Sequence, residues 1–199
     1  RLGWGHGDQE IFSVDEMQAL FTLEHVGKSP SRFNLDRLLH LNAHYIKASD
    51  PARIASLLVP FLEKRGIAAI PSPWLTSAVR TLQERARTLE EMAESAEYYF
   101  REKEADPKAA SKFLTPEVAP VLEEIARELS LLEPFTPSSM EGVLKGVVER
   151  RGGNLRIHQP IRVALTGGTA SPGLFEVMVV LGKDEVVRRL KAAARRIVP

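Results

Sequence analysis

The chain has 199 residues, a length that suits one or two domains with a hydrophobic core. Apolar residues make up 44% and charged residues 27%, and the net charge is only +1, so a nucleic-acid surface would have to be a local patch. The absence of cysteine excludes disulfides and thiolate metal sites and fits a reducing compartment. No apolar run approaches the roughly 20 residues that span a bilayer. The first residues show neither a signal-peptide pattern nor an initiator Met, so we expect a cytoplasmic fragment of a longer protein.

Helix start signals recur along the chain, each a polar residue that can cap the helix behind it. The predicted caps are Ser13, Asn34, Asp50, Ser72, Thr88, Thr115, Thr136, Ser171 and Asp184. At several of them proline takes the first helical position, where its missing amide hydrogen costs nothing. Ser13 and Thr88 are each followed three residues later by Glu, which predicts a capping box.

Apolar spacing supports the same helices. Behind Asp50 an amphipathic stripe runs to the stop at Gly66, and a second stripe follows Thr115. The first stripe contains Ile54, Leu57, Leu58, Phe61 and Leu62, and the second contains Val118, Val121, Leu122, Ile125 and Leu129. No segment shows sustained apolar–polar alternation, so the predicted fold class is all-α with about ten short helices. A polar, proline-bearing stretch at 104–115 predicts a domain boundary.

Patterns that could carry catalysis are weak. His40 and His44 stand four residues apart, but Leu41 occupies the place of the metalloprotease Glu, so we expect polar surface histidines. The glycines in LGWGHGDQ match no phosphate-loop pattern, and the acids of 84–106 alternate with basic residues as on a solvated helix face. We therefore expect no catalytic residue, metal site or cofactor site in this chain.

Basic residues concentrate in two places. Arg150, Arg151, Arg156 and Arg162 lie between predicted helices and lead into the loop of LTGGTASPGLFE. The last segment, KDEVVRRLKAAARRIVP, is also basic, and the helix dipole accounts for part of that charge.

In the loop, Ser171 can cap a helix, and Pro172 would take the first helical position. The amides of Gly173 and Leu174 would then lie near the positive end of the helix, which attracts a phosphate or a base acceptor. Small side chains would let an unstacked RNA base approach the backbone. A glycine-rich turn between helices with no ligand remains the alternative.

The stretch HQPIRVALTGGTASPGLFEVMVVLGKDEVVRRL resembles the C-terminal end of bacterial-type glutamyl-tRNA synthetases. LGWGHGDQEIFSVDEM, followed by FNLDRLLHLNAHYI, resembles the segment of that family just after its nucleotide-binding fold. The resemblance covers essentially the whole chain, in the order and at the spacing of the family.

The resemblance implies a two-subdomain helical cage. Residues 1–49 would end the stem-contact region, and residues 50–106 and 107–199 would be two anticodon-binding subdomains. The ATP-binding motifs of the family do not occur in this sequence, so the fragment should hold the tRNA for glutamate without activating glutamate, which needs ATP and Mg in the parent enzyme. We expect a monomer that binds neither DNA nor a membrane.

Individual roles follow from the matched motifs. Arg162 would contact the anticodon, and Ser171, Pro172 and Leu174 would pack on its bases. Arg85 matches an arginine that reads the third anticodon base, although an offset of two would assign that role to Gln83 or Arg87. Phosphates would contact basic residues around 150–162 and 183–196, represented by Arg150, Arg151, Arg156, Arg188 and Arg189. The alternative class is a helical protein–protein adaptor, which would need an exposed apolar groove.

Overall fold

The computed structural model describes residues 3–27 and 33–197, and these residues confirm the all-α prediction. No β-strand occurs in the described ranges beyond one isolated bridge between His6 and Gln9. The helices are α1 (Val14–Leu20), the short 3-10 helix η1 (Leu23–His25), α2 (Leu35–Ala48), α3 (Pro51–Lys64), α4 (Pro73–Leu82), α5 (Leu89–Phe100), α6 (Pro107–Phe113), α7 (Ala119–Ser130), α8 (Pro137–Arg150), α9 (His158–Thr166), α10 (Leu174–Leu181) and α11 (Lys183–Ile197).

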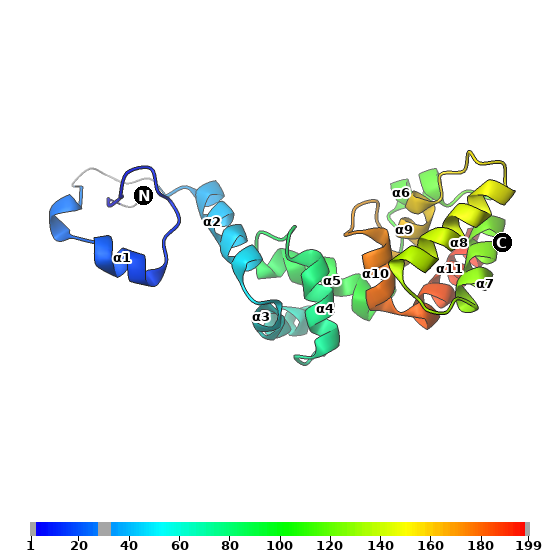
Figure 1. Ribbon diagram of the computed structural model, residues 1–199, viewed down its shortest axis with the longest axis horizontal. Helices are drawn as coiled ribbons and strands as arrows, with labels where there is room; N and C mark the ends of the chain where they lie inside the picture. The colour runs from blue at the N-terminus through cyan, green and yellow to red at the C-terminus, as the bar shows by residue number, and fades with distance from the viewer. Residues whose placement is uncertain (1–2, 28–32, 198–199) are drawn as a thin grey trace.

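The molecule is elongated (Figure 1). The segment that carries α1 lies at one end, and α2 joins it to a group formed by α3, α4 and α5. The remaining helices, α6 to α11, form a second group around the C-terminus at the far end. In the part of the chain that the structure describes, no helix is both long and apolar enough to cross a membrane.

The first hydrophobic core lies among α3, α4 and α5. Leu58, Leu62, Val79 and Met92 are completely buried there, as the amphipathic spacing of these helices requires. The end of α2 joins this core through Ile46.

The second hydrophobic core lies among α7, α8, α9, α10 and α11, with Leu122, Ile125, Ile161 and Leu190 fully buried. Helix α10 belongs to both cores, because Val177 packs into the first and Met178 into the second. The side-chain nitrogen of Trp74 on α4 also donates to the carbonyl of Val180 at 2.9 Å. The two groups of helices therefore share an element, and the subdomain division at residue 106 stays a prediction.

Most predicted caps are confirmed, each accepting a hydrogen bond from a backbone amide two or three residues into its helix. They are Ser13, Asn34, Asp50, Ser72, Thr88 and Thr136. The capping box at Ser13 is complete, but the one at Thr88 is half formed. The Glu91 carboxylate accepts from the amide of Arg87 instead, because it also pairs with that guanidinium.

Three predicted helix starts are wrong. Turns occupy the residues after Thr115, and α7 begins only at Ala119 with no side-chain cap. Helix α10 begins at Leu174 with Gly173 as its cap, so Ser171 does not cap it. Asp184 lies inside the first turn of α11. A capping signal in sequence is local, and at Ser171 the hydroxyl accepts a hydrogen bond from Arg162 instead of capping α10.

Candidate nucleic-acid interface

A cavity of about 600 Å³ lies where the two groups of helices meet. One wall comes from the end of α4 and from α5, and the opposite wall comes from the segments around 103–106 and 166–172. Its lining combines cationic, acidic and small residues, among them Arg85, Glu94, Tyr98, Lys103, Gly168, Ser171 and Pro172. The structure thus brings Arg85 and the glycine-rich loop, which are far apart in sequence, to one cavity.

Arg162 holds this loop from behind. Its Nη1 donates to the carbonyl of Pro172 at 2.7 Å, to the carbonyl of Ser171 at 3.1 Å, and to the Ser171 hydroxyl. The side chain is half-buried, and it forms no ion pair with a carboxylate within residues 3–27 and 33–197. Arg162 therefore fixes the shape of the loop with one nitrogen and keeps its positive charge uncompensated beside the cavity.

The loop is more buried than the sequence predicts. Ser171 and Pro172 are both buried, and Leu174 is only 5% exposed because it packs into the second core. The Leu174 side chain is thus unavailable to a base, and the exposed residues of the loop are Thr169, Ala170 and Gly173.

The start of α10 is also less open to anions than expected. Its N-terminal turn has no side-chain cap, but the carboxylate of Glu176 bends back over it. A β-carbon on Gly173 would stand only 2.9 Å from the Glu176 Oε2 atom. A phosphate at this helix end would therefore have to displace a carboxylate that already complements the dipole.

The structure distinguishes the three candidates for the base-reading position. Arg85 is exposed and lines the cavity. Gln83 is buried, and its amide donates to the carbonyls of Ile46 at 2.6 Å and Ser49 at 2.7 Å, which ties α2 to α4. Arg87 is paired with Glu91 at 2.7 Å. Of the three side chains, only that of Arg85 faces the cavity without a carboxylate partner in the described structure.

The positive charges of Arg85 and Arg162 act on each other. Burial lowers the pKa of the Arg162 guanidinium, and the positive charge of Arg85 lowers that pKa further. Burial raises the pKa of the Tyr98 phenol, Tyr99 adds to the rise, and the charges of Arg162 and Arg85 oppose it. The charges of two guanidinium groups thus act on one aromatic side chain, and the carboxylate residues Glu91, Glu94, Glu104 and Asp106 line the same cavity.

The arginines expected to contact phosphates differ in whether a carboxylate already pairs with them. Arg150 pairs with Glu124 at 3.0 Å and with Glu128, and Arg151 pairs with Glu124 at 2.7 Å. Arg156 is exposed and has no ion-pair partner in the described part of the chain.

On α11, Arg188 pairs with Glu185 at 2.8 Å and with Glu102 at 2.9 Å, so two carboxylates already neutralise its positive charge. Arg189 is 1% exposed, and a phosphate cannot reach it in this structure. The expectation of a phosphate contact at Arg189 is corrected by its burial, which gives the residue a structural role.

Residues that the sequence did not single out also reach the cavity. Lys103 and Tyr98 line it, although both belong to the stretch interpreted as a solvated, salt-bridged helix face. The signal was available in part, because the tyrosine pair Tyr98-Tyr99 precedes a polar linker and breaks the charge alternation. By contrast, His40 and His44 are exposed, and the described residues contain no group of three metal-ligating side chains.

Comparison with known proteins identifies the class. The model of the anticodon binding domain family matches residues 53–194, and the chain belongs to that family. The chain is 50% identical over 195 residues to the glutamate–tRNA ligase of Geotalea uraniireducens strain Rf4 and 49% identical to that of Geobacter sulfurreducens. Each alignment covers 97% of this chain but 42% of the relative, so the chain spans about two fifths of the length of these relatives.

A solved structure shows the same fold. The crystal structure of a glutamate tRNA ligase from Elizabethkingia meningosepticum CCUG26117 in complex with its amino acid superimposes with a TM-score of 0.86. The superposition covers 98% of this chain and 39% of that one at 24% identity. The helical arrangement is therefore retained where most side chains differ.

Proposed function

We propose that this chain is the anticodon-binding part of a glutamate–tRNA ligase and that it recognises the tRNA for glutamate. The single observation that carries this proposal is the cavity between the two groups of helices, which Arg85 lines and whose loop wall Arg162 supports. The family match over residues 53–194 and the similarity to glutamate–tRNA ligases support the same function.

In this function a splayed anticodon base enters the cavity and meets Arg85, while Gly168, Ala170 and the Tyr98 ring bound the space. An arginine fork can bond a base edge with two hydrogen bonds, which by analogy with duplex readout contributes about 1–3 kcal/mol of discrimination. Unstacked bases are read in this way, by their edges and by stacking. We assign the reading of the third anticodon base to Arg85, in preference to Gln83 and Arg87.

The direct test is titration of the chain with a transcript of glutamate tRNA and with a transcript whose anticodon is exchanged, at two salt concentrations. We expect tighter binding of the cognate transcript at both salt concentrations, and an affinity for each transcript that falls as salt rises. Equal affinity for the two transcripts would contradict anticodon recognition.

Arg85→Gln sharpens the assignment. We expect this substitution to lower the preference for the cognate third base by about tenfold, because glutamine cannot present the same charged fork. Arg87→Gln is the matched control, since Arg87 is paired with Glu91, and it should leave the preference unchanged. The opposite result would move the reader role to Arg87.

The wider function follows from the same proposal. Attachment of glutamate with ATP and Mg belongs to the parent enzyme, and the chain acts as a monomer in the cytoplasm, where tRNAs are charged. Light scattering of the chain at working concentration tests the monomer, and an aminoacylation assay of the isolated chain tests the absence of ligase activity.

A protein–protein adaptor is the second candidate, and one feature favours it. The N-terminal region exposes apolar side chains, with Phe33 at 63% and Leu35 at 58%, around a cavity of about 800 Å³ that Trp4 and Met17 also help to line. Binding of a partner protein there would depend weakly on salt. If the chain binds neither transcript at any salt concentration tested, the result favours the adaptor function.

A further inference from the structure

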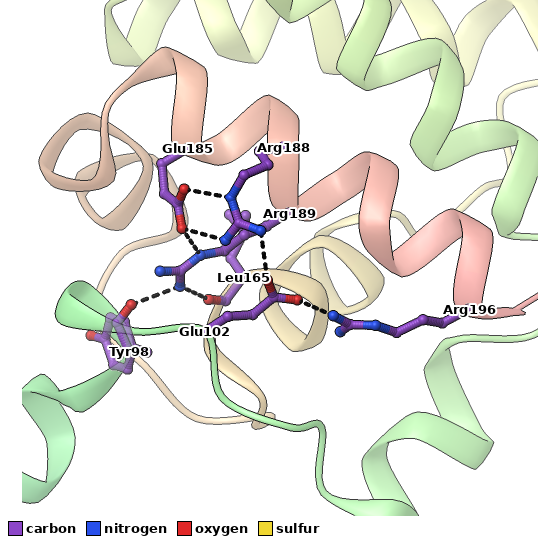
Figure 2. A network of polar contacts seen from close by, with 7 residues as sticks. All are labelled: Tyr98, Glu102, Leu165, Glu185, Arg188, Arg189 and Arg196. Atoms are coloured by element: carbon purple, nitrogen blue, oxygen red, sulfur yellow. Dashed lines mark hydrogen bonds and ion pairs between the residues drawn. The ribbon is translucent and has the colours of Figure 1, made fainter.

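Arg189 is the most deeply buried charged side chain in the described part of the protein, at 1% exposure, and the tRNA site does not use its charge directly. It lies on α11 and reaches toward the junction of the two groups of helices (Figure 2). Its Nη1 donates to the carbonyl of Tyr98 at 2.6 Å and to the carbonyl of Leu165 at 2.7 Å, while its Nε donates to Glu185 at 2.6 Å.

The two carbonyls have a common feature. Tyr98 lies in the last turn of α5, and Leu165 lies in the last turn of α9. Carbonyls in the last turn of a helix have no partner within the helix, and they carry the negative end of its dipole. One guanidinium nitrogen therefore caps two helix ends at once, one from each group of helices.

The charge of Arg189 is compensated locally. Glu185 pairs with both Arg188 and Arg189, and Glu102 pairs with both Arg188 and Arg196 (Figure 2). A buried cation that lost these partners would be costly. The network thus joins α11 to the linker that follows α5.

The capped helix ends continue directly into the two segments that form the loop wall of the cavity. After α5 the chain runs through 101–106, and after α9 it runs through 167–173. The amide of Asp106 donates to the carbonyl of Gly167 at 2.8 Å. Gly167 has a φ of +77°, and a β-carbon there would stand 2.7 Å from the carbonyl oxygen of Glu104. The two segments are therefore in close contact, and any relative movement of α5 and α9 would move this wall.

We propose that Arg189 is a positioning residue for anticodon recognition: by capping α5 and α9 together it sets the distance between Tyr98 and the glycine-rich loop, and so the width of the cavity. The inference rests on the proposed function for its biological meaning. A shift of a supporting element by even about 1 Å can disturb a recognition site.

The test compares Arg189→Met with Leu190→Ala in the whole 199-residue chain. Both substitutions remove a buried side chain of α11, and Leu190→Ala leaves a cavity in the second core but keeps the hydrogen bonds of Arg189 to the two helix ends. The measured quantity is the ratio of dissociation constants for anticodon-exchanged and cognate transcripts, at a temperature where both variants are folded. We expect Arg189→Met to lower this ratio by about tenfold and Leu190→Ala to leave it unchanged. An unchanged ratio in Arg189→Met, or an equal loss in Leu190→Ala, would overturn the proposal.

Arg189→Lys covers the case in which the methionine variant does not fold. Lysine keeps the charge, but its compact ammonium lacks the planar fork. Hydrogen exchange at the Asp106 amide supplies a readout that needs no tRNA: we expect it to speed up by about tenfold in Arg189→Lys, with the amide of Ile125 in α7 unchanged. If the wild-type chain does not discriminate between transcripts, the proposed function fails. The hydrogen-exchange rate of the Asp106 amide still tests whether Arg189 holds α5 and α9 together. An unchanged rate in Arg189→Lys contradicts the inference.

Discussion

Two arginine-bearing regions of this molecule look alike in sequence and differ in structure. In residues 150–153 at the C-terminal end of α8, here called the outer turn, Arg150 and Arg151 pair with Glu124 and Glu128 of α7. At the cavity between the two groups of helices, Arg85 has no carboxylate partner in the described structure. Arg162 donates its hydrogen bonds to carbonyls of the glycine-rich loop. A count of basic residues therefore overestimates the positive charge that is available to an anion in the outer turn, and it underestimates that charge at the cavity.

The difference teaches that pairing, more than number, decides where an anion binds. A carboxylate beside a guanidinium cancels most of its field beyond a few ångströms, and a nucleic-acid phosphate must then compete for the same nitrogen atoms. Exposed pairs of this kind add little to stability. Charge left unpaired beside a cavity is available to a ligand.

We expect the largest difference between the two regions when a glycine in each is replaced by alanine and the free energy of unfolding is measured. Gly167 at the cavity and Gly153 in the outer turn both have positive φ, but only Gly167 would place a β-carbon against backbone. We expect Gly167→Ala to lower the free energy of unfolding by about 3 kcal/mol and Gly153→Ala by about 1 kcal/mol. Urea denaturation measures both free energies. Equal losses would mean that the backbone around Glu104 moves to make room for the added β-carbon without a cost in stability.

Arg162→Ala should have the next largest effect, on binding. Its loss frees the loop carbonyls at Ser171 and Pro172, so we expect affinity for the cognate transcript to fall by about tenfold, or about 1.4 kcal/mol. The loss should depend on the anticodon, because the loop wall shapes the base cavity. Equal losses for cognate and exchanged transcripts would remove Arg162 from base recognition.

Acid should test the network on α11. Hydrogen bonds from Arg188 hold the pKa of Glu185 at about 2, below its usual value of 4.5. A depressed folded-state pKa gives stability that is present above the unfolded pKa and lost as the pH falls from about 5 toward 2. Glu185→Gln should therefore flatten the dependence of stability on pH in that window, measured as melting temperature. A pH dependence identical to that of the wild type would contradict this pairing.

The smallest effect is expected in the outer turn. Arg151→Ala should change the salt dependence of tRNA binding by much less than one counterion, because Glu124 already neutralises this arginine. Arg156→Ala is the control, since Arg156 is exposed and unpaired within the described ranges, and a phosphate contact there would lower the slope by about one. A larger change at Arg151 than at Arg156 would reverse the comparison.

The sequence by itself determined the helices, most of their caps and the family resemblance. Those features depend on residues within about four positions of each other, such as the Ser13–Glu16 box or the stripe through Leu58 and Leu62. Only the tertiary structure decided which arginines are available. Arg150 meets a carboxylate 26 residues away, and Arg189 meets a carbonyl 91 residues away, and no local pattern encodes these partners. Ser171 shows the same limit: its sequence predicts a cap, but Arg162 holds the loop so that α10 begins at Leu174.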